Sequence, residues 1–275
     1  MAVEDFGKYA LPFWAGALVD FCQRVPVNGV TKRLLFALRK PVLLLGGSPI
    51  DAGVKGARFR LYPRQNLSDK RLLCTPDQLD GVERRLLAEK LPPGSCLIDL
   101  GANIGGYCLL LAAARKDLRV VAVEADPELA QRLDDNLRFS GFADRVKALN
   151  LAVADRPGQL LLQRDSVNRG KNTVVAVSDV AGSPAETVEI DALPLLEILD
   201  QQGIVRPGAV KMDLEGFEYK VLSGFFAQAP KERWPVYLQL EQHRKEVFNP
   251  AVELALSQGY RLLKRTRMNV LLELA

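Results

Sequence analysis

Two carboxylates separated by a single residue, Asp213 and Glu215, directly follow the apolar segment 209–212. Negative charges this close together are costly unless a positive charge, a proton or a metal ion relieves them. A sulfonium group and a substrate hydroxyl would provide that relief, with Asp213 positioning the reacting groups and Glu215 accepting the hydroxyl proton. The local alternative is that Asp213 caps the next helix and Glu215 interacts with its dipole. The catalytic role and the helix-capping role are compatible with each other.

A second polar group, Glu241-Gln-His243, ends the apolar segment 235–241. Glu241 and His243 are further candidates for the base that removes a proton from a hydroxyl, because histidine titrates near neutral pH. A packing or surface role for His243 has equal weight. His243 is the only histidine in the chain, which excludes a histidine-rich metal site. We expect no metal, and magnesium bound by the two neighbouring carboxylates is the alternative.

A glycine-rich turn, residues 101–106, joins a short apolar segment to an Ala- and Leu-rich segment at 107–115. A strand, a glycine turn and a helix form the first half of a nucleotide-binding βαβ unit, in which Gly101 and Gly105 would let the backbone approach a ligand. Asn103 occupies the position where a dinucleotide fingerprint has glycine, which disfavours a pyrophosphate. It suits a ligand with a ribose and an amino-acid tail, whose ammonium Asp99 could hold through water. S-adenosylmethionine has these parts; the alternative is a turn without a ligand.

The second half of the unit follows, with a predicted strand over 119–123 that ends in Glu124. An acid at the end of this strand is placed to accept hydrogen bonds from a ribose diol. We assign the neighbouring Ala125 to the same cofactor site. Near the end of the third predicted strand, 146–153, either Asn150 or the backbone around Ala152 could read the adenine edge, and we favour the backbone.

Three residues are candidates for binding the substrate. Glu83 lies on a helix predicted over 80–91, where it could cover the ligand or be a solvated acid. Asn172 belongs to a polar loop that could bind substrate hydroxyls or be an ordinary surface loop. Lys211 lies on the fourth predicted strand, just before the paired carboxylates.

Apolar segments alternate with helical patterns along the chain and end in a predicted hairpin over 260–274. These elements predict an α/β fold with a doubly wound, mostly parallel, seven-stranded sheet whose last strand is antiparallel. Segment 57–75 is predicted as a strand followed by a turn, and 155–192 as an additional β region. We expect an N-terminal helical extension over 1–56 and a catalytic domain over 57–275.

The motifs IDLGANIGGY, VEADPELAQRLDDNL, LAVADRPGQLLL and VKMDLEGFEYKVLSG resemble the FkbM family of class I, Rossmann-like S-adenosylmethionine-dependent methyltransferases. The resemblance covers about residues 57–243. It implies O-methylation of a hydroxyl on a secondary metabolite, a sugar or a glycolipid. It also implies that the glycine turn and Glu124 bind the cofactor, and that Asp213, Glu215 and Glu241 lie at the active edge.

Three other functions compete with this one: methylation of RNA or protein, a catalytically silent cofactor-binding module, and a nicotinamide oxidoreductase. The chain lacks the Asn/Asp-Pro-Pro-aromatic tetrapeptide of enzymes that methylate amino groups of bases. Its net charge of +4 is modest, and we expect no sequence-specific nucleic acid binding. The acids at the strand ends disfavour a silent module, and Asn103 disfavours a nicotinamide cofactor.

The charge is uneven, because residues 1–60 contain nine Lys/Arg and four Asp/Glu, a net charge of +5. Segments 10–23 and 31–45 are apolar with basic flanks. They could contact a membrane surface, cover the active site, or pack on the core as a helical cap, which we favour. Four unpaired cysteines, the absence of a basic leader and the lack of a spanning apolar run predict a cytoplasmic protein.

Overall fold

The structure is a computed structural model of the chain, and it describes residues 4–163, 173–175, 187–242 and 248–275. At its centre is a seven-stranded sheet with the order β12-β13-β11-β10-β3-β4-β5. Six of these strands run in the same direction, and β13 runs in the opposite direction. The predicted doubly wound sheet with an antiparallel last strand is therefore confirmed. Its strands are β3 (Cys96–Leu100), β4 (Arg119–Glu124), β5 (Val146–Asn150), β10 (Ala209–Met212), β11 (Tyr237–Glu241), β12 (Tyr260–Arg265) and β13 (Asn269–Leu274).

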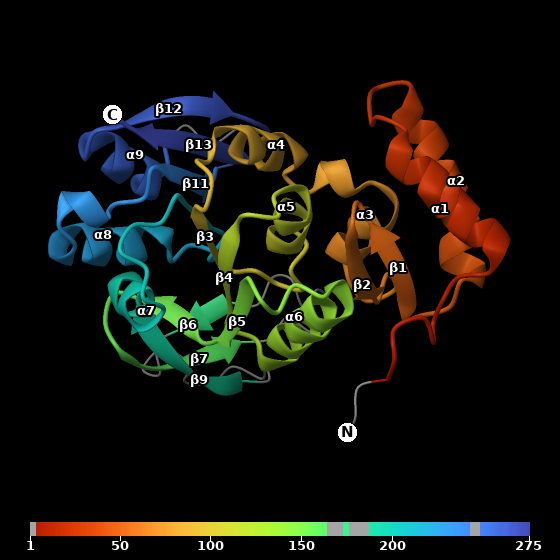
Figure 1. The fold of residues 1–275 in the computed structure, drawn as a ribbon, viewed down its shortest axis with the longest axis horizontal. Coiled ribbons are helices and arrows are strands. Elements are labelled where there is room, and N and C mark those ends of the chain that lie inside the picture. The colour runs from red at the N-terminus through yellow and green to blue at the C-terminus, as the bar shows by residue number, and fades with distance from the viewer. Residues whose placement is uncertain (1–3, 164–172, 176–186, 243–247) are drawn as a thin grey trace.

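Helices cover both faces of the sheet (Figure 1). The first three are α4 (Gly81–Lys90), α5 (Cys108–Ala114) and α6 (Pro127–Ser140), and they share one apolar cluster. The other three, α7 (Leu195–Gln201), α8 (Glu218–Gln228) and α9 (Pro250–Ser257), share the second cluster. Successive side chains of β3 point to opposite faces of the sheet, so Leu97 packs into the first cluster and Ile98 into the second. The core thus has two layers, one on each side of the sheet.

A second sheet lies beside the first, in the order β6-β9-β7-β8. The predicted third strand is divided at Leu151, because β5 ends at Asn150 and β6 begins at Ala152. The additional β region predicted over 155–192 forms most of this sheet. Its strands are β6 (Ala152–Ala154), β7 (Gly158–Gln163), β8 (Thr173–Val175) and β9 (Thr187–Pro194).

The N-terminal part differs from the prediction in two segments. Its elements are α1 (Phe13–Arg24), α2 (Thr31–Leu45), β1 (Ile50–Val54), β2 (Ala57–Leu61), α3 (Leu67–Cys74) and the 3₁₀ turn η1 (Pro76–Gln78), with a second such turn, η4 (Lys231–Arg233), later in the chain. Residues 67–74, predicted as a turn, form a helix whose first turn is capped by Asn66, which accepts a hydrogen bond from the Ser68 backbone. Residues 50–54 lie in the segment predicted as helical, but form a strand paired with β2.

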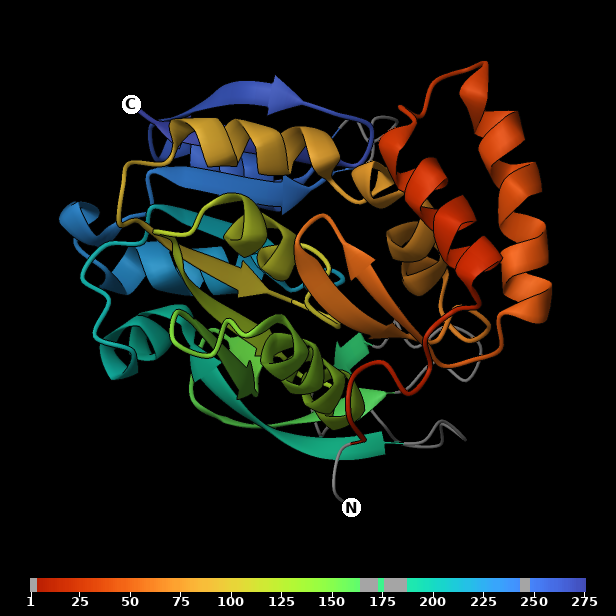
Figure 2. The same cartoon turned by 45° about the vertical axis from the view of Figure 1, so that its right-hand side comes forward.

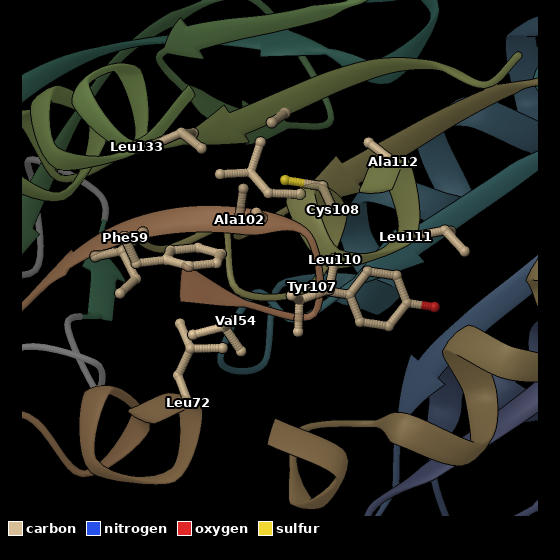
Figure 3. Close-up of a cluster of buried hydrophobic side chains, with 14 of the residues drawn as sticks. Val54, Phe59, Leu72, Ala102, Tyr107, Cys108, Leu110, Leu111, Ala112 and Leu133 are labelled. Atoms are coloured by element: carbon tan, nitrogen blue, oxygen red, sulfur yellow. The ribbon is translucent and has the colours of Figure 1, made fainter. Parts of the chain in front are cut away.

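The hairpin β1–β2 is joined to the core rather than to α1 and α2 alone. Figure 3 shows Val54 and Phe59 of the hairpin with Leu72 of α3 and Leu133 of α6 in one apolar cluster. The Arg60 backbone N–H also donates to Asn136 of α6, at 2.8 Å. The predicted boundary between residues 56 and 57 lies between these paired strands, and the two-domain division remains a proposal.

In the part of the chain that the structure describes, no helix combines the length and the apolar character needed to span a membrane.

Candidate active site

An open cavity of about 710 Å³ lies where the carboxyl ends of β3, β4 and β10 meet the start of β6. This is the edge at which α/β sheets of this type bind ligands. Seven residues predicted for the site line it: Gly101, Asn103, Glu124, Ala125, Ala152, Asp213 and Glu215. Apolar side chains complete the wall: Val123, Leu129, Leu151, Val153, Leu162, Leu214 and Phe217. The structure thus brings together residues that are more than 100 positions apart in the sequence.

Gly101 is required by the packing of two strand ends. Its φ is +75°, and a Cβ atom there would lie 2.0 Å from the backbone oxygen of Asp213. No other residue can occupy this position without moving β3 away from β10. Gly105 also has a positive φ, but a Cβ there would meet Leu133 at 2.7 Å and Leu109 at 2.9 Å. Gly105 therefore packs the turn against helices and does not line the cavity.

Glu124 is fixed in the cavity wall by two backbone N–H groups. One carboxylate oxygen accepts from the Asn103 backbone at 2.7 Å and the other from the Asp126 backbone at 2.9 Å. Asn103 itself has a φ of +52°, and its side-chain oxygen accepts from the Ile104 backbone at 2.8 Å. Burial raises the pKa of Glu124 to about 7. Each anchored oxygen retains a lone pair, so the carboxylate can still accept hydrogen bonds from a ligand diol.

Lys211 carries a buried positive charge beside the glycine turn. Its Nζ donates to the Gly101 carbonyl at 3.1 Å and lies 3.3 Å from Asp99 and 3.5 Å from Asp213. Burial lowers the pKa of Lys211, but the carboxylates of Asp99, Asp213 and Asp80 outweigh it and raise the pKa above its usual value. Lys211 is therefore charged at neutral pH. Asp99 is fully buried and pairs with Lys211, and it does not line either cavity at this edge of the sheet.

A second cavity of about 510 Å³ shares Gly101, Asn103 and Asp213 with the first. Its other lining residues are Ser68, Leu72, Leu79, Asp80, Ala102, Ile104, Gly106, Tyr107 and Lys211. It opens between the glycine turn and the segment that contains α3 and η1. Because the two cavities meet at three residues, an elongated ligand could occupy both.

Asp80 is a site residue that the sequence analysis missed. It precedes α4 with a φ of +49°, and its carboxylate accepts from Asn269 at 2.8 Å. Burial raises its pKa to about 6. The sequence contains one relevant signal, the dipeptide Asp80-Gly81, which is typical of turns. Asp80 does precede the helix predicted from this position, but its side chain makes no capping hydrogen bond and lines the second cavity instead.

Glu83 lies outside both cavities. It is buried, and one carboxylate oxygen accepts from the Thr266 hydroxyl and, at 3.2 Å, from Asn269. These contacts join α4 to the turn of the hairpin β12–β13. None of these contacts bears on the predicted binding of substrate by Glu83, which stays a prediction.

The acids after β10 and β11 form a common electrostatic environment. Glu218, which the sequence analysis did not single out, accepts from the Leu214 backbone at 2.7 Å and from the Gly216 backbone at 3.0 Å. Both N–H groups belong to the loop before α8, and α8 has no side-chain cap, so the capping role considered for Asp213 is absent. Burial raises the pKa of Glu241 to about 7, assisted by the negative charges of Asp213, Glu215 and Glu218. Asp213 is 44% exposed in its side chain and lines both cavities.

The structure distinguishes the two groups predicted to read the adenine edge, the Asn150 side chain and the backbone around Ala152. Asn150 donates to the backbone oxygens of Glu124 at 2.9 Å and Ala125 at 3.0 Å, and it supports the cavity wall without lining it. Ala152 lines the cavity, as the backbone alternative requires. His243 and Asn172 lie outside the described residues.

A profile of the methyltransferase FkbM domain matches residues 99–262, more than half of the chain. The chain belongs to the FkbM methyltransferase family. Three curated relatives align with parts of this FkbM chain. It is 25% identical over 169 residues to the methyltransferase sdnD of Sordaria araneosa (52% of this chain, 64% of the relative). It is 26% identical over 183 residues to the hexuronic acid methyltransferase AglP of Haloferax volcanii (64% of this chain, 68% of the relative).

The third relative is the tRNA(Phe) (4-demethylwyosine(37)-C(7)) aminocarboxypropyltransferase of Pyrococcus horikoshii, 28% identical over 129 residues (46% of this chain, 43% of the relative). Among solved structures, the METTL16 MTase domain aligns with a TM-score of 0.50 and 14% identity, over 92% of this chain and 83% of that one. This likeness shows the fold alone, that of class I, Rossmann-like methyltransferases. The FkbM chain spans about two thirds or less of the lengths of the three curated relatives.

Proposed function

We propose that the protein transfers a methyl group from S-adenosylmethionine to a hydroxyl of a small molecule, a sugar or a glycolipid. The observation that carries the proposal is the Glu124 carboxylate, held by two backbone N–H groups beside the glycine turn at 2.7 and 2.9 Å. This geometry presents a fixed acceptor to a ribose diol. Membership of the FkbM methyltransferase family supports the reaction class.

The two cavities fit the two ends of this cofactor. The first has apolar walls, including Leu151, Leu162 and Phe217, that suit an adenine ring, with Glu124 beside them for the ribose. The second contains charges of both signs, Asp80 and Lys211. A zwitterionic amino-acid tail is complementary to such a pair. In this proposal Asp80, rather than the buried Asp99, faces the ammonium group.

The cofactor supplies an electrophilic methyl group, and the chain supplies position and a proton acceptor. Asp213 lies at the junction of the two cavities and positions the reacting groups. The hydroxyl proton passes to Glu241, Glu215 or His243. Among these, Glu215 lines the first cavity, whereas Glu241 lines neither cavity but has a pKa raised to about 7, which suits a base at neutral pH.

A carbohydrate is the acceptor that we favour, because the relative from Haloferax volcanii is named for its action on a hexuronic acid. The relative from Pyrococcus horikoshii is named for a tRNA, and RNA is therefore the control acceptor. The modest net charge of +4 favours the carbohydrate.

Calorimetric titration with S-adenosylmethionine and S-adenosylhomocysteine, with NADH as the control, tests the cofactor. We expect both sulfur compounds to bind, Glu124→Ala to abolish binding, and Asp134→Ala, on the exposed side of α6, to leave it unchanged. Transfer of labelled methyl to glucuronides and to tRNA then tests the acceptor. Absence of binding, or equal binding of NADH, would contradict the proposed cofactor, and transfer only to tRNA would contradict the proposed acceptor.

A further inference from the structure

The segment that forms α1 and α2 exposes a higher proportion of large apolar side chains than the remainder of the described chain. Fourteen large hydrophobic residues are exposed in the described parts of the chain, and six of them lie within residues 13–45. These six are Phe13, Trp14, Phe21, Val30, Leu34 and Leu44. Single exposed hydrophobic residues are normal, whereas a concentration of them indicates an interaction surface. Figure 2 shows α1 and α2 side by side at one end of the molecule.

The inner faces of both helices are already packed. On α1, Val19 and Cys22 are buried, while Phe13 and Phe21, two helical turns apart, are exposed on the opposite side. On α2, Leu35 and Val42 belong to the same apolar cluster as the core. The expected packing of the N-terminal helices on the core is therefore present. This packing covers only the inner face of each helix. The outer face of each helix has no packing partner among the described residues.

The same outer surface is basic. Residues 13–45 contain five Lys/Arg and a single acid, Asp20. The five are Arg24, Lys32, Arg33, Arg39 and Lys40. None of them forms an ion pair within the described part of the chain, although Lys32 and Arg39 lie over the Phe36 ring at 5.7 and 4.7 Å. The positive charges are thus available to a negatively charged partner.

We propose that the outer faces of α1 and α2 bind an anionic lipid surface. Exposed aromatic and aliphatic side chains interspersed with lysine and arginine are the combination that lies in the interface of a bilayer. Charge decides against a second copy of the chain as the occupant. In a twofold dimer the same basic patch would face itself, and like charges would repel. Nucleic acid would use the charges but leave the apolar side chains in water.

This surface is one helix away from the proposed active site. The Gln23 side chain of α1 donates to the Leu73 carbonyl of α3 at 2.9 Å. Ser68 and Leu72 of α3 line the second cavity. A lipid surface bound by α1 and α2 would therefore bring a membrane-associated acceptor near the cavity edge. The binding itself does not depend on the methyl transfer, and it can be tested without it.

Sedimentation with phosphatidylcholine vesicles, with and without phosphatidylglycerol, tests the proposal on the full chain. We expect binding only to the anionic vesicles, weakened by salt. Since each basic residue near an anionic surface contributes about 1 kcal/mol, Arg33→Glu with Lys40→Glu should lower the partition coefficient by roughly tenfold or more. The matched control is Arg261→Glu with Lys264→Glu on β12, away from α1 and α2 in Figure 1, which should bind as the wild type does.

Tryptophan emission provides a second readout. Trp14 is 45% exposed and Trp234 is 7% exposed, so a blue shift on anionic vesicles reports Trp14, and Trp14→Phe should abolish the shift. S-adenosylhomocysteine titration of the same variants separates this proposal from the proposed function, because their cofactor affinity should be unchanged. The proposal would be overturned if the folded protein bound no vesicles or bound neutral vesicles equally well. It would also be overturned if charge reversal changed the oligomeric state or RNA binding instead of lipid binding.

Discussion

Glu124 and Glu241 end two strands of the same sheet, and burial is the main cause that raises the pKa of each to about 7, but their surroundings differ. Burial raises the pKa of Glu124, while two backbone N–H groups hold the carboxylate in place. At Glu241, burial is assisted by repulsion from Asp213, Glu215 and Glu218. The first carboxylate is held rigidly by uncharged donors and is suited to binding. The second is surrounded by three other acids, whose negative charges favour uptake of a proton, and it is suited to proton transfer.

The largest effect should come from changing Gly101, which lies where the ends of β3 and β10 meet. Gly101→Ala would place a Cβ 2.0 Å from the Asp213 oxygen, so β3 and β10 must separate. We expect a loss of roughly 3 kcal/mol of unfolding free energy and of cofactor binding, measured by chemical denaturation and calorimetry. Gly203→Ala is the control, because Gly203 has a similar φ of +64° but open space around it. An equal loss in both variants would mean that backbone strain, not strand separation, is responsible.

Glu241→Gln should separate proton transfer from binding. If Glu241 is the base, kcat falls by roughly 10²- to 10⁴-fold, while the cofactor dissociation constant stays unchanged. The wild-type rate should rise with pH through about 7, as the carboxylate loses its proton, and the variant should lack this step. Steady-state kinetics across the pH range measure both. A retained pH step would assign the base to Glu215 or His243.

Glu124→Gln should have the complementary effect on binding. It removes the charge from an acceptor of ligand hydroxyls, and hydrogen bonds to charged groups contribute about 1.5–3 kcal/mol. We expect cofactor affinity to fall by roughly 10- to 100-fold in calorimetry, with little change in kcat at saturating cofactor. If kcat fell while affinity held, the distinction drawn between the two carboxylates would be reversed.

The smallest effect should appear in stability as a function of pH. A carboxyl whose pKa is raised by folding contributes stability that is fully present below its unfolded value of about 4.5 and is lost as pH rises through about 7. The wild type should therefore be more stable at pH 5 than at pH 8 if these groups dominate. Thermal unfolding of Glu124→Gln should show a smaller difference between these pH values. An unchanged difference would indicate that other groups control it.

The sequence was sufficient to predict the central sheet, because its signals are local. Apolar runs of strand length, the glycine turn after Leu100 and the Asp126-Pro127 helix start each specify their own element. The N-terminal segment was predicted less well. The strand β1 is only five residues long and gains stability from pairing with β2, a partner that periodicity does not reveal.

The sequence by itself determined which side chains end each strand, and therefore which acids share an edge of the sheet. It identified Glu124, Asp213 and Glu241, since strand alternation and sheet polarity follow from local pattern. Only the tertiary structure decided how these groups are partnered. It buried Asp99 against Lys211, paired Glu218 with backbone N–H groups of the loop before α8, and placed Asp80 at the second cavity. Hydrogen bonds and charges act over a few ångströms in space, and only folding determines which residues lie that close.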